Sequence, residues 1–195
     1  MAKRSESNRI GLGDFRVVAI SALVLGGWAL VTAASAAHAS DGVVEINHAR
    51  AQAGGITSGD ASGYPVSINE SGSYRLTGTL TIPGGTTSPD TDGIVITAND
   101  VTLDLNGFMV TCQRSTIPST PCANVDGAGI GILMVGENIQ ISGGTVRDMA
   151  SYGVFAALGT SYTLEGIRAR NNRGDGFHAR PSSMGRISRS IFWLS

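Results

Sequence analysis

The sequence predicts an all-β fold, a short solenoid of the right-handed parallel β-helix type. Two repeats support this prediction. In the first repeat, glycine precedes a large apolar residue at Gly93, Gly131, Gly153 and Gly176. In the second, apolar residues at the centre of short alternating runs recur at Leu103, Ile141, Leu164 and Ile187. After one longer step, both repeats advance by about 23 residues at a time, which indicates a stack of similar units.

Residues 1–39 carry the pattern of a Sec-type signal peptide. Four basic residues come before an apolar run, and small residues close the segment at Ala37 and Ala39. This order predicts export, with cleavage between Ala39 and Ser40. We therefore expect a secreted, periplasmic or cell-surface protein. The alternative is a chain anchored in the membrane by this uncleaved segment, because about 18 apolar residues approach the length of a spanning helix.

Apolar and polar residues alternate within each repeat, for example in residues 101–105 and 139–142. A period of two places the apolar side chains on one face of a strand. Leucine-rich repeats require a denser leucine frame, and left-handed hexapeptide helices require a period in multiples of six. A wide parallel β-helix explains the mixed apolar residues and the uneven spacing better.

The long first step of both repeats predicts an inserted loop at residues 111–127. This stretch holds the only two cysteines of the chain, Cys112 and Cys122. In an exported protein we expect them to form a disulfide that closes the loop. A metal site is less favoured there, because no histidine or further cysteine lies near them in the sequence.

A resemblance to a known family is carried by Asp-Gly-Val-Val-Glu-Ile-Asn at residues 41–47, Ser-Gly-Ser-Tyr-Arg-Leu-Thr-Gly at 71–78 and Val-Thr-Leu-Asp-Leu-Asn-Gly at 101–107. On these segments the chain resembles exported bacterial proteins described as right-handed parallel β-helix repeat proteins, whose architecture is similar to that of pectate lyases. The resemblance implies a helix that caps the first coil at residues 45–53, with Gly54 and Gly55 as its stop. The exported part then divides into a cap with the first strands at 40–92 and coils at 93–195.

The far end of the predicted solenoid has no comparable polar closing element, since residues 187–195 are strongly apolar. A bare apolar end exposes strand edges and core residues. We expect either a truncated reading frame or an end that docks on a partner.

The exported part contains ten arginines, no lysine and thirteen carboxylates, which gives a net charge of about −3. This balance argues against general nucleic-acid binding. Most carboxylates lie before residue 140 and most arginines after it. Such asymmetry suits an acidic polymer, although solvated faces of two signs explain it more simply.

Two outward carboxylates are candidates for catalysis. If the second repeat points inward, Asp104 and Glu165 point outward two coils apart, roughly 9 to 10 Å from each other. That separation borders the range for the two carboxylates of an inverting glycosidase. Outward positions on a strand are polar in any solenoid, however, so the presence of Asp104 and Glu165 also has a purely structural explanation.

The resemblance adds a second group of candidates. In polysaccharide lyases of this fold a basic residue removes a sugar proton, while carboxylates hold calcium against the acidic groups of the substrate. This makes Arg168, Arg170 and His178 candidates for binding an acidic glycan or moving its proton. The sequence has no dense aspartate cluster, so we expect no metal site and no cofactor, and calcium is implied by the resemblance alone.

These observations predict a secreted scaffold that binds a surface or extracellular glycan. The expected partner is an extracellular or envelope polysaccharide and not a nucleic acid, and contact with a membrane is expected only through an uncleaved signal segment. The alternative is a carbohydrate-active enzyme, a polysaccharide lyase or a glycosidase, or a fragment of one.

Overall fold

The computed structural model describes residues 42–83, 91–113 and 129–193. The chain divides into two units, Met1–Ala37 and His38–Ser195, and every described residue belongs to the second unit. The predicted signal peptide and its cleavage site between Ala39 and Ser40 therefore lie outside the described residues. Within them strands predominate, the only helix has six residues, and all strand pairs are parallel. The prediction of a mostly β fold is confirmed.

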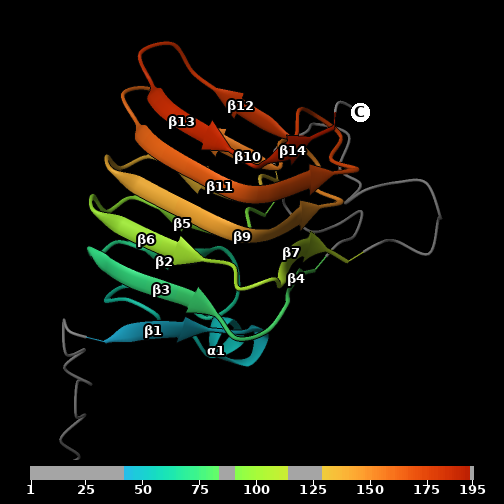
Figure 1. Ribbon diagram of the computed structural model, residues 1–195. Helices are drawn as coiled ribbons and strands as arrows, with labels where there is room; N and C mark the ends of the chain where they lie inside the picture. Colours follow the sequence, from blue (N-terminus) through green and yellow to red (C-terminus); the bar gives the residue numbers. More distant parts are fainter. Residues whose placement is uncertain (1–41, 84–90, 114–128, 194–195) are drawn as a thin grey trace, which may run out of the picture. The chain divides into compact units, whose positions relative to one another are not determined.

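Two parallel sheets make up the described part of the second unit (Figure 1). The nine-stranded sheet follows the order β1 (Val43–Ile46), β3 (Gly72–Leu76), β6 (Val101–Asp104), β9 (Ile139–Arg147), β11 (Ser161–Arg170) and β13 (Met184–Ser188). Its remaining members are β4 (Leu80–Ile82), β7 (Met109–Cys112) and β14 (Ile191–Phe192). The five-stranded sheet follows the order β2 (Val66–Ile68), β5 (Ile94–Ile96), β8 (Ile132–Met134), β10 (Val154–Ala156) and β12 (Phe177–Ala179).

The chain alternates between the two sheets, and each passage lies beside the preceding one, so that the passages form stacked coils. The second sequence repeat is a ladder of paired residues in the nine-stranded sheet: Leu103, Ile141, Leu164 and Ile187. The first repeat is the matching ladder in the five-stranded sheet: Ile94, Ile132, Val154 and Phe177. Both predicted ladders are confirmed, and all of their side chains except Ile187 pack in the core between the sheets or against it.

The stack begins earlier than the sequence repeat indicated. Tyr74 pairs with Leu103 on one side and with Val44 on the other, so the ladder continues into β3 and β1. The steps from Val44 to Tyr74 and from Tyr74 to Leu103 are both longer than the step that separates the later members of the ladder. The first strands expected in residues 40–92 therefore belong to the same stack of coils.

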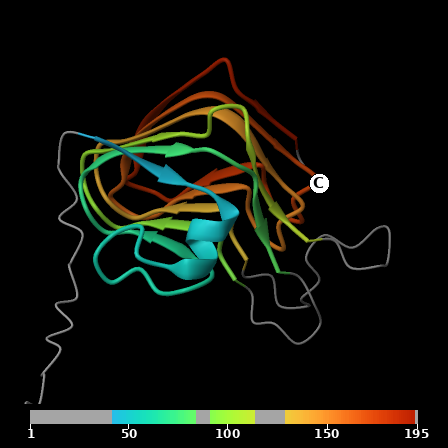
Figure 2. The ribbon, with the colours of Figure 1, turned by 90° about the horizontal axis from the view of Figure 1, so that it is seen from below.

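The capping helix α1 (His48–Ala53) is shorter than the helix predicted at residues 45–53, because the first residues of that range belong to β1. Asn47 separates the two elements. Its backbone is extended, and its side chain accepts a hydrogen bond from the Arg50 N–H at 3.0 Å, which makes it the N-cap. The helix ends at Gly54, the predicted stop, where φ is 76°. Figure 2 shows α1 lying across the interior of the first coils.

The predicted inserted loop starts later than residue 111. Thr111 and Cys112 lie in β7, where they pair with Thr81 and Ile82 of β4. Cys112 is buried at this position. Cys122 lies outside the described residues, so the disulfide between the two cysteines stays a prediction.

Candidate functional site

The outward face of the nine-stranded sheet carries a strip of hydrogen-bonding side chains. Because the strands pair in parallel and in register, outward residues of successive strands form columns with a spacing of about 4.8 Å. The first column crosses five strands and consists of Ser73, Thr102, Gln140, Thr163 and Arg186. All five residues reach the surface, and all but Thr163 are exposed. This column offers hydroxyl, amide and guanidinium groups to an extended ligand.

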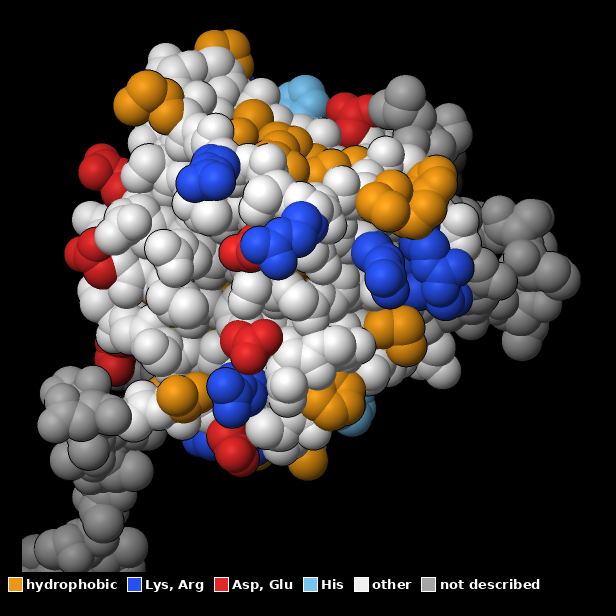
Figure 3. Space-filling model, viewed as in Figure 1, with side chains coloured by type: hydrophobic (Ala, Val, Ile, Leu, Met, Phe, Trp, Pro, Cys, Tyr) orange, Lys and Arg blue, Asp and Glu red, His pale blue; other side chains and the backbone are white. Residues whose placement is uncertain are grey.

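The second column contains the two candidate carboxylates, Asp104 and Glu165, with Ser142 between them. The predicted separation of two strands is therefore correct. Each carboxylate already has a cationic partner, because Arg75 Nε lies 3.2 Å from Asp104 and Arg189 Nη2 lies 3.0 Å from Glu165. Figure 3 shows basic and acidic side chains following one another up the middle of this face.

Asp104 also has a local structural role. Its Oδ1 accepts a hydrogen bond from the Asn106 N–H at 2.7 Å, just after β6 ends. Asn106 has a left-handed backbone with φ of 50°, so the carboxylate stabilises the turn that follows the strand. These contacts favour the structural explanation of Asp104 over the catalytic one.

The arginine candidates lie on the second half of β11, on the same face. Arg168 and Arg170 are both exposed, and within the described ranges neither forms an ion pair. Outward residues two apart on a strand are separated by roughly 6.6 Å. Their guanidinium groups therefore start from neighbouring points of one surface.

Two further residues extend the arginine surface across neighbouring strands. Arg147 of β9 pairs in register with Arg170. On the other side, the Trp193 N–H donates to the Ala169 carbonyl at 3.0 Å, so Trp193 continues the column of Arg170. The side of Trp193 that faces away from the core is open, since the residue is 46% exposed. Figure 3 shows a basic group beside apolar side chains at one side of this face.

We call the four residues Arg147, Arg168, Arg170 and Trp193 the arginine–tryptophan surface. The sequence alone could have predicted how far this surface extends. Arg147, Arg170 and Trp193 follow one another at the same step as the inward ladder of Ile141, Leu164 and Ile187. Arg147 is half-buried and its Nε contacts the buried carboxylate of Asp148, which fixes its position. The surface thus has one anchored arginine, two arginines without an ion pair in the described part, and one exposed aromatic ring.

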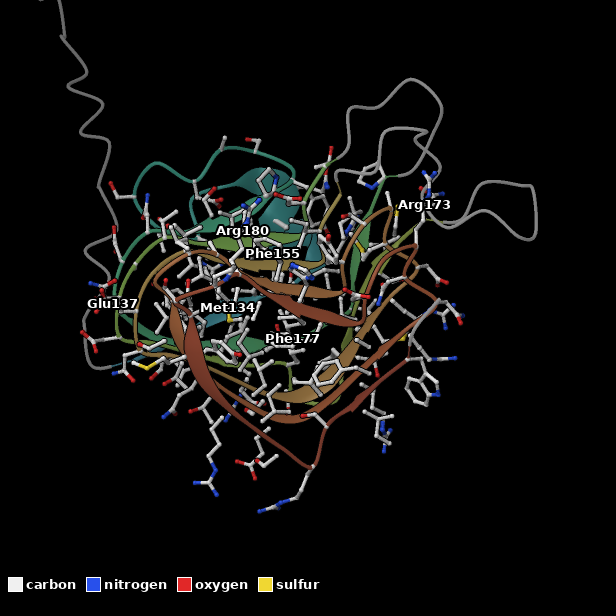
Figure 4. All side chains as sticks on the ribbon, turned by 90° about the horizontal axis from the view of Figure 1, so that it is seen from above. Met134, Glu137, Phe155, Arg173, Phe177 and Arg180 are labelled. Atoms are coloured by element: carbon white, nitrogen blue, oxygen red, sulfur yellow. The ribbon has the colours of Figure 1, made fainter. Side chains whose placement is uncertain are left out.

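The structure separates His178 from these arginines. His178 lies on β12 of the five-stranded sheet, where its ring stacks on Tyr152 and Phe155 at centroid distances of 4.7 and 5.5 Å. Its Nδ1 lies 3.1 Å from Asp175 Oδ2. Arg180 covers the Phe155 ring at 5.7 Å, and Figure 4 shows these two residues close together. His178 therefore lies on a different sheet from Arg168 and Arg170, and its role in binding or proton transfer stays a prediction.

The described residues do not fit a calcium site. No group of three or more His, Cys, Asp or Glu side chains in the described ranges comes together in a way that could hold a metal ion. Calcium coordination requires six to eight oxygen ligands, mostly from carboxylates. Asp104 and Glu165 each contact an arginine instead.

The described part of the chain also contains no helix that is long and apolar enough to cross a membrane.

Comparisons of the chain with models of protein families, with curated proteins and with solved structures found no match.

Proposed function

We propose that this protein is an exported right-handed parallel β-helix scaffold that binds an acidic polysaccharide on the outward face of its nine-stranded sheet, without chemical conversion of the ligand. The observation that carries the proposal is the arginine–tryptophan surface, in which Arg147, Arg170 and Trp193 follow one another on adjacent strands. Export brings the scaffold to the compartment where such polymers occur.

The chemistry of this surface suits a carboxylated or sulfated sugar chain. Guanidinium groups form charge-assisted, bidentate hydrogen bonds with carboxylate, sulfate and phosphate groups. Arg168 and Arg170 keep their donors available, since they are exposed and form no ion pair in the described ranges. Trp193 offers an apolar ring with a polar N–H at its edge, a combination that matches the apolar face and hydroxyl rim of a sugar ring.

The surrounding face supports a ligand longer than one sugar. The column from Ser73 to Arg186 adds hydroxyl and amide groups at each strand step of about 4.8 Å. A parallel sheet holds these groups at fixed distances, so a polymer can bind without reordering the protein. Binding by many weak contacts on an extended surface is typical of solenoid proteins.

Catalysis is not needed to explain any of these residues. The two candidate carboxylates, Asp104 and Glu165, are in ion pairs with Arg75 and Arg189. The histidine candidate lies on the other sheet. A binding role accounts for the remaining exposed arginines.

The proposal is tested by binding of the exported protein to polygalacturonate, alginate and heparin, with dextran as an uncharged comparison. We expect binding to at least one polyanion that weakens as salt rises, because the contacts are ionic. Replacing both exposed arginines, Arg168→Gln with Arg170→Gln, should weaken it by about tenfold or more, and Trp193→Ala by several-fold. Arg50→Gln on α1 is the matched control, since it removes the same kind of charge at the opposite end of the stack.

Two results would contradict the proposal. The first is an unchanged affinity in the double arginine variant, with its fold verified by circular dichroism. The second is the release of new reducing ends or unsaturated sugars from any of these polymers, which would make the protein an enzyme and return Asp104 and Glu165 to the catalytic role.

A further inference from the structure

The outward face of the five-stranded sheet is apolar at its centre, unlike that of the nine-stranded sheet. Each strand has three residues, and the middle one faces outward, because its two neighbours pack in the core or against it. The outward column therefore consists of Ser67, Val95, Leu133, Phe155 and His178. Its three central members are apolar, whereas the first column of the nine-stranded sheet contains polar residues only.

A second column widens this apolar surface. It consists of the residues that follow the strands, and the Val135 N–H, for example, donates to the Ile96 carbonyl on the preceding coil at 2.8 Å. Val135 is 44% exposed, and Leu158, two residues after β10, is 65% exposed. We call Val95, Leu133, Val135, Phe155 and Leu158 the apolar face. Further coils would lengthen such a face without covering it, because each coil adds its strand beside the last.

The apolar face has opposite charges at its two ends. Glu70 lies just after β2 in the first of these coils, and Arg180 directly follows β12 in the last. The half-buried Glu70 accepts a hydrogen bond from the Ser58 N–H at 2.9 Å, and Arg180 is exposed and contacts the Phe155 ring (Figure 4). Within the described ranges neither of the two charged groups forms an ion pair. Neither belongs to the arginine–tryptophan surface.

A second copy of the chain complements this surface. The middle strand of the sheet is β8, so a two-fold axis parallel to the strands and passing over β8 brings Leu133 against its own copy. Val95 of each copy then packs on Phe155 of the other, since β5 and β10 flank β8 equally. The same rotation places Glu70 opposite Arg180, twice in each dimer. A rotation about the axis of the stack would instead place Arg180 against Arg180, which like-charge repulsion disfavours.

We propose that the apolar face is a homodimer interface, in which two copies of this protein pack their five-stranded sheets face to face with their stacks antiparallel. Exposed apolar patches with a polar rim mark interaction sites, and the charges at the two ends set the orientation. The dimer leaves the outward face of the nine-stranded sheet open in both copies. The proposal therefore does not depend on polysaccharide binding.

The first test is sedimentation velocity of the exported protein over a wide range of concentration. We expect a reversible change from monomer to dimer as the concentration rises. Leu133→Lys should abolish the dimer, because the two-fold axis brings two lysines together. Gln140→Lys is the matched control, since it adds the same charge to an exposed position of the nine-stranded sheet and should leave dimerisation unchanged.

A charge reversal tests the orientation. Glu70→Lys and Arg180→Glu should each weaken the dimer by about tenfold, because each brings like charges together twice. The double variant, Glu70→Lys with Arg180→Glu, should recover the affinity of the parent protein. A merely structural role of either residue would not produce this recovery.

A cross-link tests the axis without a charged substitution. Leu133→Cys should give a disulfide-linked dimer under mild oxidation, because each new thiol lies beside its own copy. Gln140→Cys should not. A monomer at every concentration would overturn the proposal, and so would an unchanged dimer in Leu133→Lys or a double charge variant weaker than both single variants. None of these results bears on polysaccharide binding, which is measured separately.

Discussion

A Cβ atom on Gly131 would lie 2.5 Å from the carbonyl oxygen of Gly153 on the next coil. The same relationship recurs one step on, where a Cβ on Gly153 would lie 2.6 Å from the carbonyl oxygen of Gly176. Each of these oxygens accepts a hydrogen bond from the residue after the preceding glycine, as in the bond of 3.0 Å from the Ile132 N–H to Gly153. The glycine repeat therefore exists because adjacent coils approach too closely for a side chain.

Gly131→Ala should destabilise the protein by about 1–3 kcal/mol, since the new Cβ would meet the Val146 side chain and also the Gly153 carbonyl oxygen, which belongs to the backbone and cannot rotate away. Chemical denaturation gives the free energy of unfolding. Gly78→Ala is the matched control, because its Cβ would come no closer than 3.4 Å to Asn47 Cβ, an ordinary contact. Equal losses in the two variants would show that the close approach at Gly131 is not the cause.

The sequence predicted the later coils well for this same reason. Glycine and the inward apolar residue are both imposed by the stacking distance, so they recur at one constant step wherever the coils are regular. The earlier coils have longer steps, from Val44 to Tyr74 and from Tyr74 to Leu103, and one of their inward residues is a tyrosine, so period and residue type changed together. A search for one fixed period passes over such coils.

Leu164→Ala should cost about 2–5 kcal/mol of unfolding free energy, because Leu164 is completely buried between Ile141 and Ile187. Ile187→Ala at the next ladder position should cost less than about 1 kcal/mol, since Ile187 is 43% exposed. The two substitutions remove similar side chains from one ladder, so urea denaturation of both variants measures how far the last coil differs from the interior. Similar losses would show that the exposure of Ile187 does not lower its contribution to stability.

Stability should fall between about pH 10 and pH 12. Burial is the main cause that raises the pKa of both Tyr64 and Tyr74 from 10.0 to about 12. A tyrosine with a higher pKa in the folded state keeps its proton more tightly when folded, so its contribution is complete below pH 10 and is lost as pH rises through 12. Urea denaturation at pH 8 and pH 11.5 measures the loss.

Tyr74→Phe separates the hydrogen bond from the titration. The Tyr74 hydroxyl donates to the Glu70 carbonyl at 2.7 Å, so the variant should lose about 1 kcal/mol at pH 8. It should also show a smaller further loss at pH 11.5 than the parent protein, because one titrating group is gone. An alkaline loss of the same size in both proteins would remove Tyr74 from the explanation.

The candidate site was predictable only in part. Arg168 and Arg170 share a strand, so their alternate positions were enough to place them on one face. Arg147 and Trp193 join them through pairing between strands, which needs the register of three coils. His178 was assigned to the group by resemblance, although it follows Phe177 of the first repeat directly, whereas Arg168 and Arg170 follow Leu164 of the second repeat.

Asp104→Asn tests whether the carboxylate column is structural. The Arg75 and Asp104 side chains are 50% and 33% exposed, and exposed ion pairs contribute about 0–1 kcal/mol. An asparagine oxygen can still accept the Asn106 N–H, so the turn should survive and the loss of stability should stay below about 1 kcal/mol. Polysaccharide affinity should not fall, because the arginine–tryptophan surface is untouched.

Glu165→Gln, which breaks the contact with Arg189, should behave in the same way. A large loss of binding in either variant would place the carboxylates in the ligand site and support the enzyme alternative.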